Sequence, residues 1–339
     1  MDTVRETLLQ LSSEEKEERK KVRVDYYYYK GACEDKVKAK NDKPKLGQNW
    51  ESQDNLDYEP TQDIRNKVKP LLKKQARWMF SKEPDITIVP FDTNQKELAE
   101  ELRRFIDNIL RKNLFWKKTR QAFLMSTIKK RVMLRASVKV GNENTYGGIN
   151  LRYEDIENFS YKEIDGVLTE ARFFQEDLNN YLYEDDESKK TYYIHKFTYE
   201  VIKENTPAEA TYVIETYKGD NLLKPINSAS KEIGFEENKI PAWLIKNGGE
   251  LGEEFGETDL HDLKPSQDRY NKTTSDVADA IKFSLFGIES GIDLHPDDVN
   301  KFNISPGALH VARTSDEALE KGKQGNLQRQ EFSLSNISS

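Results

Sequence analysis

Residues 247–288 constrain the fold most, because a glycine-rich, acidic turn leads there into the longest amphipathic helix that the sequence predicts. The helix start is marked by Glu257-Thr258-Asp259. Pro265 either begins the main helix near its first turn or kinks it. From Pro265 to Ile288 such a helix measures about 36 Å at ~1.5 Å per residue.

The two halves of this helix differ in character. A helical projection gives the first half an apolar stripe and a polar face, whereas the second half, from Val277, is apolar nearly all round. Such a helix must be covered on several sides, and a ring of identical helices covers it through heterologous interfaces. We therefore expect a ring-forming protein. The apolar stripe is Leu263, Tyr270, Thr274, Val277, Ile281, Leu285 and Ile288.

Two groups of side chains on this helix are candidates for a role in assembly. The polar face is our candidate for a tunnel lining or a seam between subunits, and it carries Asp268, Lys272, Asp276 and Asp279. The candidates for packing between subunits lie in the apolar half, and they are Phe283, Phe286, Leu285 and Ile288.

Composition limits the class of protein. The 339 residues are enough for two or three domains, and 16 Tyr, 15 Phe and 4 Trp are too many aromatic residues for a disordered chain. The single cysteine, Cys33, excludes an internal disulfide and fits a reducing compartment. The sequence contains neither a signal-peptide core nor the ~18 apolar residues of a membrane span. We expect no membrane partner.

The net charge of −7 argues against a protein that coats DNA, which would normally carry a basic surplus. It does not argue against a protein that lets DNA slide past. Each phosphate that a protein neutralises adds salt-dependent affinity for DNA. A surface that is acidic or of mixed charge therefore favours passage of DNA over tight binding.

The first half of the chain predicts mainly helices. We expect a charged surface helix over residues 3–22, then four tyrosines at 26–29 that form either a buried helix end or a strand-like segment. A long exposed loop follows. Three further helices are expected, at 64–79, 94–113 and 114–135. The first should be kinked at Pro70, and a short strand at 85–89 should separate it from the second.

The stretch from Arg103 to Arg135 is the most basic in the chain, with eleven Lys or Arg against one acid, Asp107. It is either a face that contacts DNA phosphates or a solvated helix pair balanced by acidic regions elsewhere. The candidate phosphate contacts are Lys117, Lys118 and Arg120.

Residues 136–235 change to alternating β-branched and aromatic residues separated by turn signals, which predicts an antiparallel meander. His195 lies in one of these strands as a packing residue. A buried strand is expected at 239–247. The fold class is therefore α+β, with a long helix after the sheet layer.

No catalytic motif is present, whether a phosphate loop, a dinucleotide fingerprint, a zinc-binding H-E-x-x-H or a nucleophile elbow. Acidic pairs such as Asp297-Asp298 are more typical of solvated loops than of an Mg²⁺ site, although a small metal-dependent nuclease remains an alternative. We expect no catalytic, cofactor or metal site and no enzyme activity.

Several motifs resemble those of tailed-bacteriophage portal proteins, which are head-tail connectors. The runs are YYYYKG at 26–31, IRNKVKPLLKKQARWMFSKEPDITI at 64–88, IPAWLIKN at 240–247 and GETDLHDLKPSQDRYNKTTSDVADAIKFS at 256–284. Their order and spacing carry the resemblance, which covers most of residues 20–335. Another phage neck or adaptor protein is the alternative within the same class.

The resemblance implies a homo-oligomeric ring, typically a dodecamer, at one vertex of the capsid in the virion, assembled in the host cytoplasm. Double-stranded DNA passes through its tunnel during packaging and ejection. Its partners are terminase, the major capsid or scaffold protein and a neck or adaptor protein.

The resemblance also divides the chain into parts. We expect an N-terminal helix (1–23), a wing (24–246, helical over 61–135 and mainly β over 136–246), a hinge with the first stem helix (247–288), and a small β-containing clip (289–339). The family's chain continues into a returning stem helix and a crown, and we expect both to be absent from these 339 residues. Either the chain is a truncated product, in which case rings of it alone are expected to be unstable, or the clip assignment is wrong.

Overall fold

The computed structural model describes residues 2–31, 47–48, 60–139, 148–183, 186–199, 210–233, 239–248, 253–286, 288–299 and 312–330. The chain divides into two compact units. Unit 1 comprises Met1–Gly47 with Asn66–Lys264, and unit 2 comprises Gln48–Arg65 with Pro265–Ser339. Each unit is described by itself.

The N-terminal segment forms two helices, α1 (Asp2–Leu8) and α2 (Ser13–Lys30), and not the single helix expected at 3–22. The break has a local cause, because the Ser12 hydroxyl accepts the amide of Glu15 and starts a new helix as an N-cap. The tyrosine run forms the end of α2. Tyr28 and Tyr29 are buried there, which selects the helical alternative.

Helix α3 (Val68–Met79) starts later than expected, and Pro70 lies in its first turn without kinking it. The first amides of a helix have no partner within it, so the N–H that proline lacks is not missed. The strand predicted at 85–89 is wrong: these residues are not in a β-ladder in the structure, and Val89 is 80% exposed.

Two further helices follow, α4 (Lys96–Lys112) and α5 (Phe115–Lys129). The third helix, predicted to reach Arg135, ends at Lys129, because strand β1 (Arg131–Lys139) starts there and pairs on both sides. Lys130, with a positive φ of 72°, reverses the chain between them.

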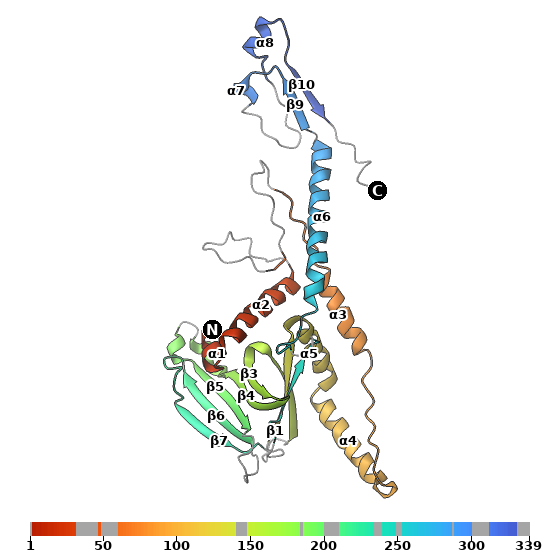
Figure 1. The fold of residues 1–339 in the computed structure, drawn as a ribbon, viewed down its shortest axis with the longest axis vertical. Coiled ribbons are helices and arrows are strands. Elements are labelled where there is room, and N and C mark those ends of the chain that lie inside the picture. The colour runs from red at the N-terminus through yellow and green to blue at the C-terminus, as the bar shows by residue number, and fades with distance from the viewer. Residues whose placement is uncertain are drawn as a thin grey trace. The chain divides into compact units, whose positions relative to one another are not determined.

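The antiparallel meander predicted over 136–235 is confirmed from residue 159 on, as a five-stranded sheet in the order β3-β4-β5-β6-β7, whereas the strands predicted before residue 156 pair in a different sheet. Its strands are β3 (Phe159–Ile164), β4 (Val167–Glu176), β5 (Thr191–Tyr199), β6 (Ala210–Lys218) and β7 (Asn227–Lys231). A second sheet has the order β2-β1-β8, with β2 at Gly148–Asp155 and β8 at Ala242–Lys246. Within unit 1, the five-stranded sheet and helices α3, α4 and α5 lie on opposite sides (Figure 1).

Three apolar clusters fill unit 1. One lies where Val22 of α2 meets Phe159 and Phe173 of the five-stranded sheet. A second joins Leu8 and Leu9 to the central strands β4, β5 and β6. The third contains Tyr28 and Tyr29 with residues of α3 and α5 and the first residue of α6. The α+β class is thus confirmed, with helices packed on antiparallel sheets.

One charged group is buried in the same unit. Glu15 accepts hydrogen bonds from Arg19 at 2.8 Å and from Arg131 at 3.2 Å, and both arginines are almost fully buried. A second nitrogen contact of Arg19 goes to the Phe159 carbonyl oxygen at 2.5 Å. Burial lowers the pKa of Arg19, and Glu15 opposes that shift. This group ties α2 to β1 and to the start of β3.

Helix α6 (Leu260–Phe286) contributes residues 260–264 to unit 1 and the remainder to unit 2. Beyond it, unit 2 contains β9 (Ile288–Ile292), α7 (Pro296–Val299), α8 (Asp316–Glu320) and β10 (Asn326–Gln330). Strands β9 and β10 pair antiparallel. Residues 300–311 and 331–339 of this unit lie outside the described residues.

Candidate functional site

Helix α6 begins in a network of hydrogen bonds at the end of α5. The Thr258 hydroxyl lies 3.2 Å from the Thr127 carbonyl oxygen and 3.0 Å from that of Ile128. The Asp259 amide donates to Thr127 at 2.9 Å. The last carbonyls of an α-helix have no partner within the helix, so these two residues satisfy the end of α5. The start of α6 is thereby fixed in unit 1.

The turn before α6 is held by Asn247 and Gly256. The backbone amide of Asn247 donates to the Lys130 carbonyl oxygen at 2.7 Å, and its side-chain amide donates to the Asp259 carboxylate at 2.8 Å. Gly256 has a φ of +76°, and a Cβ there would lie 3.0 Å from the Lys130 carbonyl oxygen, so only glycine fits. Residues 249–252 lie outside the described part, and the hinge expected here stays a prediction.

In unit 2, one polar stripe of α6 is buried. Its side chains are four residues apart, which places them one above the other on one face of the helix. They are Gln267, Asn271, Ser275 and Asp279, each at most 6% exposed. The segment 60–65, which we call the strap, lies along this polar stripe in extended form.

Alternate amides of the strap donate to the polar stripe. The three bonds join Thr61 to Asp279, Asp63 to Ser275 and Arg65 to Asn271, at N···O distances of 3.0, 2.9 and 3.3 Å. Two extended residues advance about 6.6 Å, and four helical residues advance about 6 Å, so the two repeats match. The polar stripe therefore accepts hydrogen bonds from the backbone amides of the strap, as a neighbouring β-strand would.

Asp279 differs from the other three tunnel or seam candidates. It is 6% exposed and accepts the Thr61 amide, and Lys282 lies beside both residues. Burial raises the pKa of this carboxyl, but hydrogen bonds from Thr61 and Lys282 outweigh burial and lower it below its ordinary value. Asp268, Lys272 and Asp276 are exposed.

The apolar stripe expected to be covered is, in its described part, largely at the surface. Tyr270 and Val277 are each 36% exposed and Ile281 is 42% exposed. Leu263, by contrast, packs against the third cluster of unit 1. The reason is that the strap presents backbone amides, which need acceptors, so α6 turns its polar face to the strap.

The basic stretch contains fewer exposed cations than its sequence indicates. Lys129 pairs with Asp155 at 2.7 Å and Lys130 with Glu18 at 2.5 Å, while Arg131 belongs to the buried group with Glu15. Of the candidate phosphate contacts, Lys118 donates to the Leu151 carbonyl oxygen at 3.1 Å. The other two candidates, Lys117 and Arg120, are exposed on α5.

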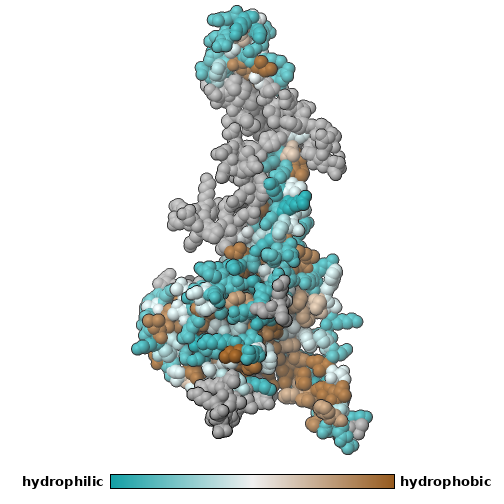
Figure 2. Space-filling view, viewed as in Figure 1, coloured by the Kyte–Doolittle hydropathy of each residue, from teal (hydrophilic) through white to brown (hydrophobic). Residues whose placement is uncertain are grey.

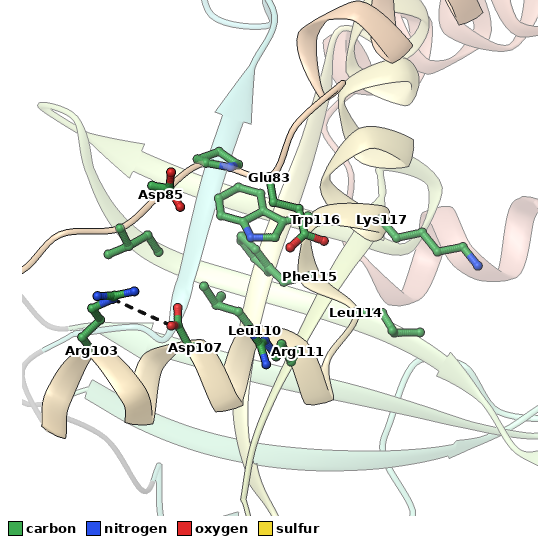
Figure 3. Close-up of a pocket in the computed structure, with 12 residues that line it drawn as sticks. Glu83, Asp85, Arg103, Asp107, Leu110, Arg111, Leu114, Phe115, Trp116 and Lys117 are labelled. Carbon is green, nitrogen blue, oxygen red and sulfur yellow. Dashed lines mark ion pairs between the residues drawn. The ribbon is translucent and has the colours of Figure 1, made fainter. Parts of the chain in front are cut away.

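A cavity of about 400 Å³ lies between the segment 83–86 and the corner of α4 and α5. Its wall includes Phe115 and Trp116, whose rings meet edge to face with centroids 5.1 Å apart. Arg103 and Asp107 lie 4.0 Å apart at its rim, and Lys117 extends away from it (Figure 3). The cavity thus combines an aromatic wall with acidic and basic side chains in equal number, Glu83, Asp85 and Asp107 with Arg103, Arg111 and Lys117.

The model of a protein family, described as "Phage portal protein, SPP1 Gp6-like", matches residues 8–288. That match spans both sheets of unit 1, the network at the start of α6 and the polar stripe. The chain belongs to this phage portal protein family. None of the curated proteins matches it significantly.

Within this portal-family chain, the candidates for packing between subunits are only partly described. Phe283, Leu285 and Phe286 lie in α6, but their side chains are outside the described residues. Ile288, expected on the helical stripe, is instead the first residue of β9. The roles of these residues and of the polar-face candidates stay predictions.

His195 packs within the portal chain's five-stranded sheet as expected. Its ring lies 6.0 Å from that of Tyr212, and its nitrogens bond the Tyr212 hydroxyl and Gln175. Burial, with the nearby charge of Arg135, lowers the pKa of His195 to about 4, so the imidazole is neutral near pH 7.

In the described ranges, the side chains of His, Cys, Asp and Glu form no group of three or more that could hold a metal ion. Among the helices described, none has the length and apolar character needed to span a bilayer. Cys33 lies outside the described residues.

The strap is the feature of this site that reasoning from sequence missed. The sequence predicts a loop over 32–60 and a helix from residue 64, so the strap at 60–65 falls across an expected boundary and no contact with α6 is predicted for it. A signal was present in α6, where amide, hydroxyl and carboxyl side chains recur every four residues. Such a row of acceptors indicates a helix that binds backbone amides.

Proposed function

We propose that copies of this chain form a ring at one vertex of a phage capsid and that DNA passes through it during packaging and ejection. The match to the portal family over residues 8–288 carries the proposal. In the ring, α6 is the first stem helix. A structural role without enzyme activity is part of the same proposal.

The exposed faces of α6 support a place in a ring wall. One side of the helix is occupied by the strap. The remaining surface presents charged residues such as Lys272 and Asp276 and half-exposed apolar residues such as Val277 and Ile281. A stem helix in a ring needs both kinds of surface, the first toward solvent or DNA and the second toward neighbouring copies.

The ring has twelve copies in our proposal, and its partners are terminase, a capsid or scaffold protein and a neck or adaptor protein. The hairpin of β9 and β10, with α7 and α8, is the candidate docking part for terminase and neck. Arg313 pairs with Asp298 at 2.9 Å and links the end of α7 to the segment before α8.

Electron microscopy of the purified protein tests the proposal. Because rings of these residues alone are expected to be unstable, mild chemical cross-linking precedes the measurement. We then expect end-on views with a central hole and a single rotational symmetry, and mass photometry should give one closed oligomer of the same subunit number. Particles without a hole, or a protein that stays monomeric under cross-linking at micromolar concentration, would contradict the proposal. A solid oligomer of fixed size would favour the neck or adaptor alternative.

A further inference from the structure

Helix α4 displays an apolar face that the described structure leaves uncovered. Leu98, Leu102 and Phe105, spaced along one face, are 62%, 46% and 55% exposed, and α4 contributes no buried residue in the structure as described. In Figure 2 hydrophobic side chains gather over this helix. An apolar patch of this kind on a water-soluble surface marks an interaction site.

A second apolar ridge lies in the connection between β4 and β5. The 3₁₀ segment Leu178–Tyr183 exposes Leu178, Tyr181 and Leu182 by 87%, 67% and 61%. The segment is firmly held, because the buried Asn180 makes two hydrogen bonds of 2.8 Å with the backbone of Thr191. Its large side chains are therefore presented outward on a fixed support.

The two apolar surfaces carry opposite charge. Residues 96–120, which comprise α4 and the start of α5, contain eight basic residues and four acids, a net of +4. Residues 176–190 contain six acids and two lysines, a net of −4. Complementary charge of this size steers association and fixes its register.

The two surfaces also differ in form. The cavity beside α4 has an aromatic wall and a volume of about 400 Å³, enough to receive a side chain. The Leu178–Tyr183 segment is a ridge of large side chains with acids on both flanks. A hollow beside one surface and a ridge on the other are complementary in form.

Within unit 1, α4 and the β4–β5 connection lie on opposite sides, with the sheets between them (Figure 1). One copy therefore cannot join its own two surfaces, whereas neighbouring copies can. We propose that the apolar face of α4 in one copy docks onto the Leu178–Tyr183 ridge of the next copy. The contact is heterologous, so every copy uses both surfaces, as closure of a ring requires.

Site-directed cross-linking tests this contact. In a Cys33→Ser background, one variant carries Leu102→Cys and a second carries Leu182→Cys. When the two are produced together and mildly oxidised, we expect a disulfide-linked dimer of the two variants. Either variant alone should give none. Leu223→Cys, at an exposed residue outside both surfaces, is the control partner for Leu102→Cys and should give no more than background.

Charge reversal adds an independent measurement. Arg103→Glu with Arg104→Glu should weaken assembly by at least tenfold in concentration, and Asp186→Lys with Glu187→Lys should restore it. Failure of this rescue would overturn the charge pairing. Arg103, Arg104 and Glu187 are exposed and Asp186 is partly exposed, and circular dichroism checks that each variant keeps its fold.

The inference rests on the proposed function, but the outcomes separate the two. Closed rings without the cross-link between 102 and 182 overturn the contact and leave the ring. Cross-linked open chains support the contact and count against the ring. Self-cross-linking of Leu102→Cys, or a protein that stays monomeric, overturns the contact.

Discussion

Helix α2 meets the sheets of unit 1 through apolar side chains such as Val22, whereas the strap meets α6 in unit 2 through amides and side-chain oxygens. Of the unit 2 side chains whose burial is described, the buried ones are Gln48, Gln267, Asn271, Ser275, Asp279 and one apolar residue, Ala318. Apolar burial is non-directional and scales with area. Hydrogen bonds require aligned partners. Unit 1 is thus stabilised mainly by buried area and the strap contact by alignment.

The difference matters for assembly. A cluster such as the one around Phe159 tolerates small rotations of its elements, because contacts are exchanged for similar ones. The strap has one register on α6, since a shift by one residue would turn its amides away from the polar stripe. We infer that the strap fixes which faces of α6 remain exposed.

The largest effect is expected from the apolar interior of unit 1. Phe159→Ala should destabilise the protein by about 3–5 kcal/mol, because the ring is fully buried and leaves a cavity. Chemical denaturation followed by circular dichroism measures this. Phe91→Ala, at a fully exposed ring, is the control and should change stability by less than about 0.5 kcal/mol. Equal effects of the two variants would show that the first cluster is not a core.

The group of Glu15, Arg19 and Arg131 is a buried polar contact in unit 1, and removing its acid tests whether alignment matters there too. Glu15→Ala leaves the guanidinium groups of Arg19 and Arg131 without their shared carboxylate, and we expect a loss of about 3 kcal/mol. The same denaturation measurement applies. Glu17→Ala removes a fully exposed ion pair with Lys20 and should have little effect. A small effect of Glu15→Ala would mean that water reaches this group.

Much of unit 1 could be predicted from sequence, because its elements obey local rules. Alternating β-branched and aromatic residues in β4 and β5, with glycine turns between strands, predict the meander. Apolar residues at helical spacing predict α4. Errors arose where a single residue decided a boundary. The hydroxyl of Ser12 divides the first helix, and the reversal at Lys130 ends α5 before a strand whose residues had suited a helix.

The buried face of α6 could not be predicted in the same way. Hydrophobic periodicity assumes that apolar residues face inward, and this rule placed Tyr270 and Val277 inside and Asp279 outside. The partner of α6 is an extended backbone about 200 residues earlier in the chain, as the bond between Arg65 and Asn271 shows. Periodicity within a helix carries no information on such a partner.

A smaller effect is expected when one acceptor of the polar stripe is removed. Asn271→Ala leaves the amide of Arg65 and the side chain of Gln267 without their shared partner, which costs about 1–3 kcal/mol. Amide hydrogen exchange at Arg65 should accelerate about tenfold or more, since ~1.4 kcal/mol corresponds to a factor of ten. As a control, Lys272→Ala at the exposed neighbouring residue should leave amide exchange at Arg65 unchanged. Unchanged exchange in Asn271→Ala would contradict the role of the stripe.

The smallest effect concerns pH and distinguishes Asp279 from the uncharged members of the stripe. The pKa of Asp279 is lowered in the folded state, so its carboxylate contributes stability above the ordinary aspartate pKa of about 3.9. This contribution is lost as the pH falls through the folded pKa. Protection of the Thr61 amide should therefore be constant above about pH 4 and decline below it.

Asp279→Asn keeps the shape of the side chain and removes its titration, so protection at Thr61 should be weaker at neutral pH and should show no such decline. The Asp63 amide is an internal control, because it donates to the Ser275 hydroxyl, which does not titrate in this range. Exchange rates corrected for intrinsic pH dependence give both values in one experiment. An equal decline at Thr61 and Asp63 would indicate general acid unfolding. A decline confined to Thr61 would locate the titrating contact at Asp279 and show that the strap detaches from that end first.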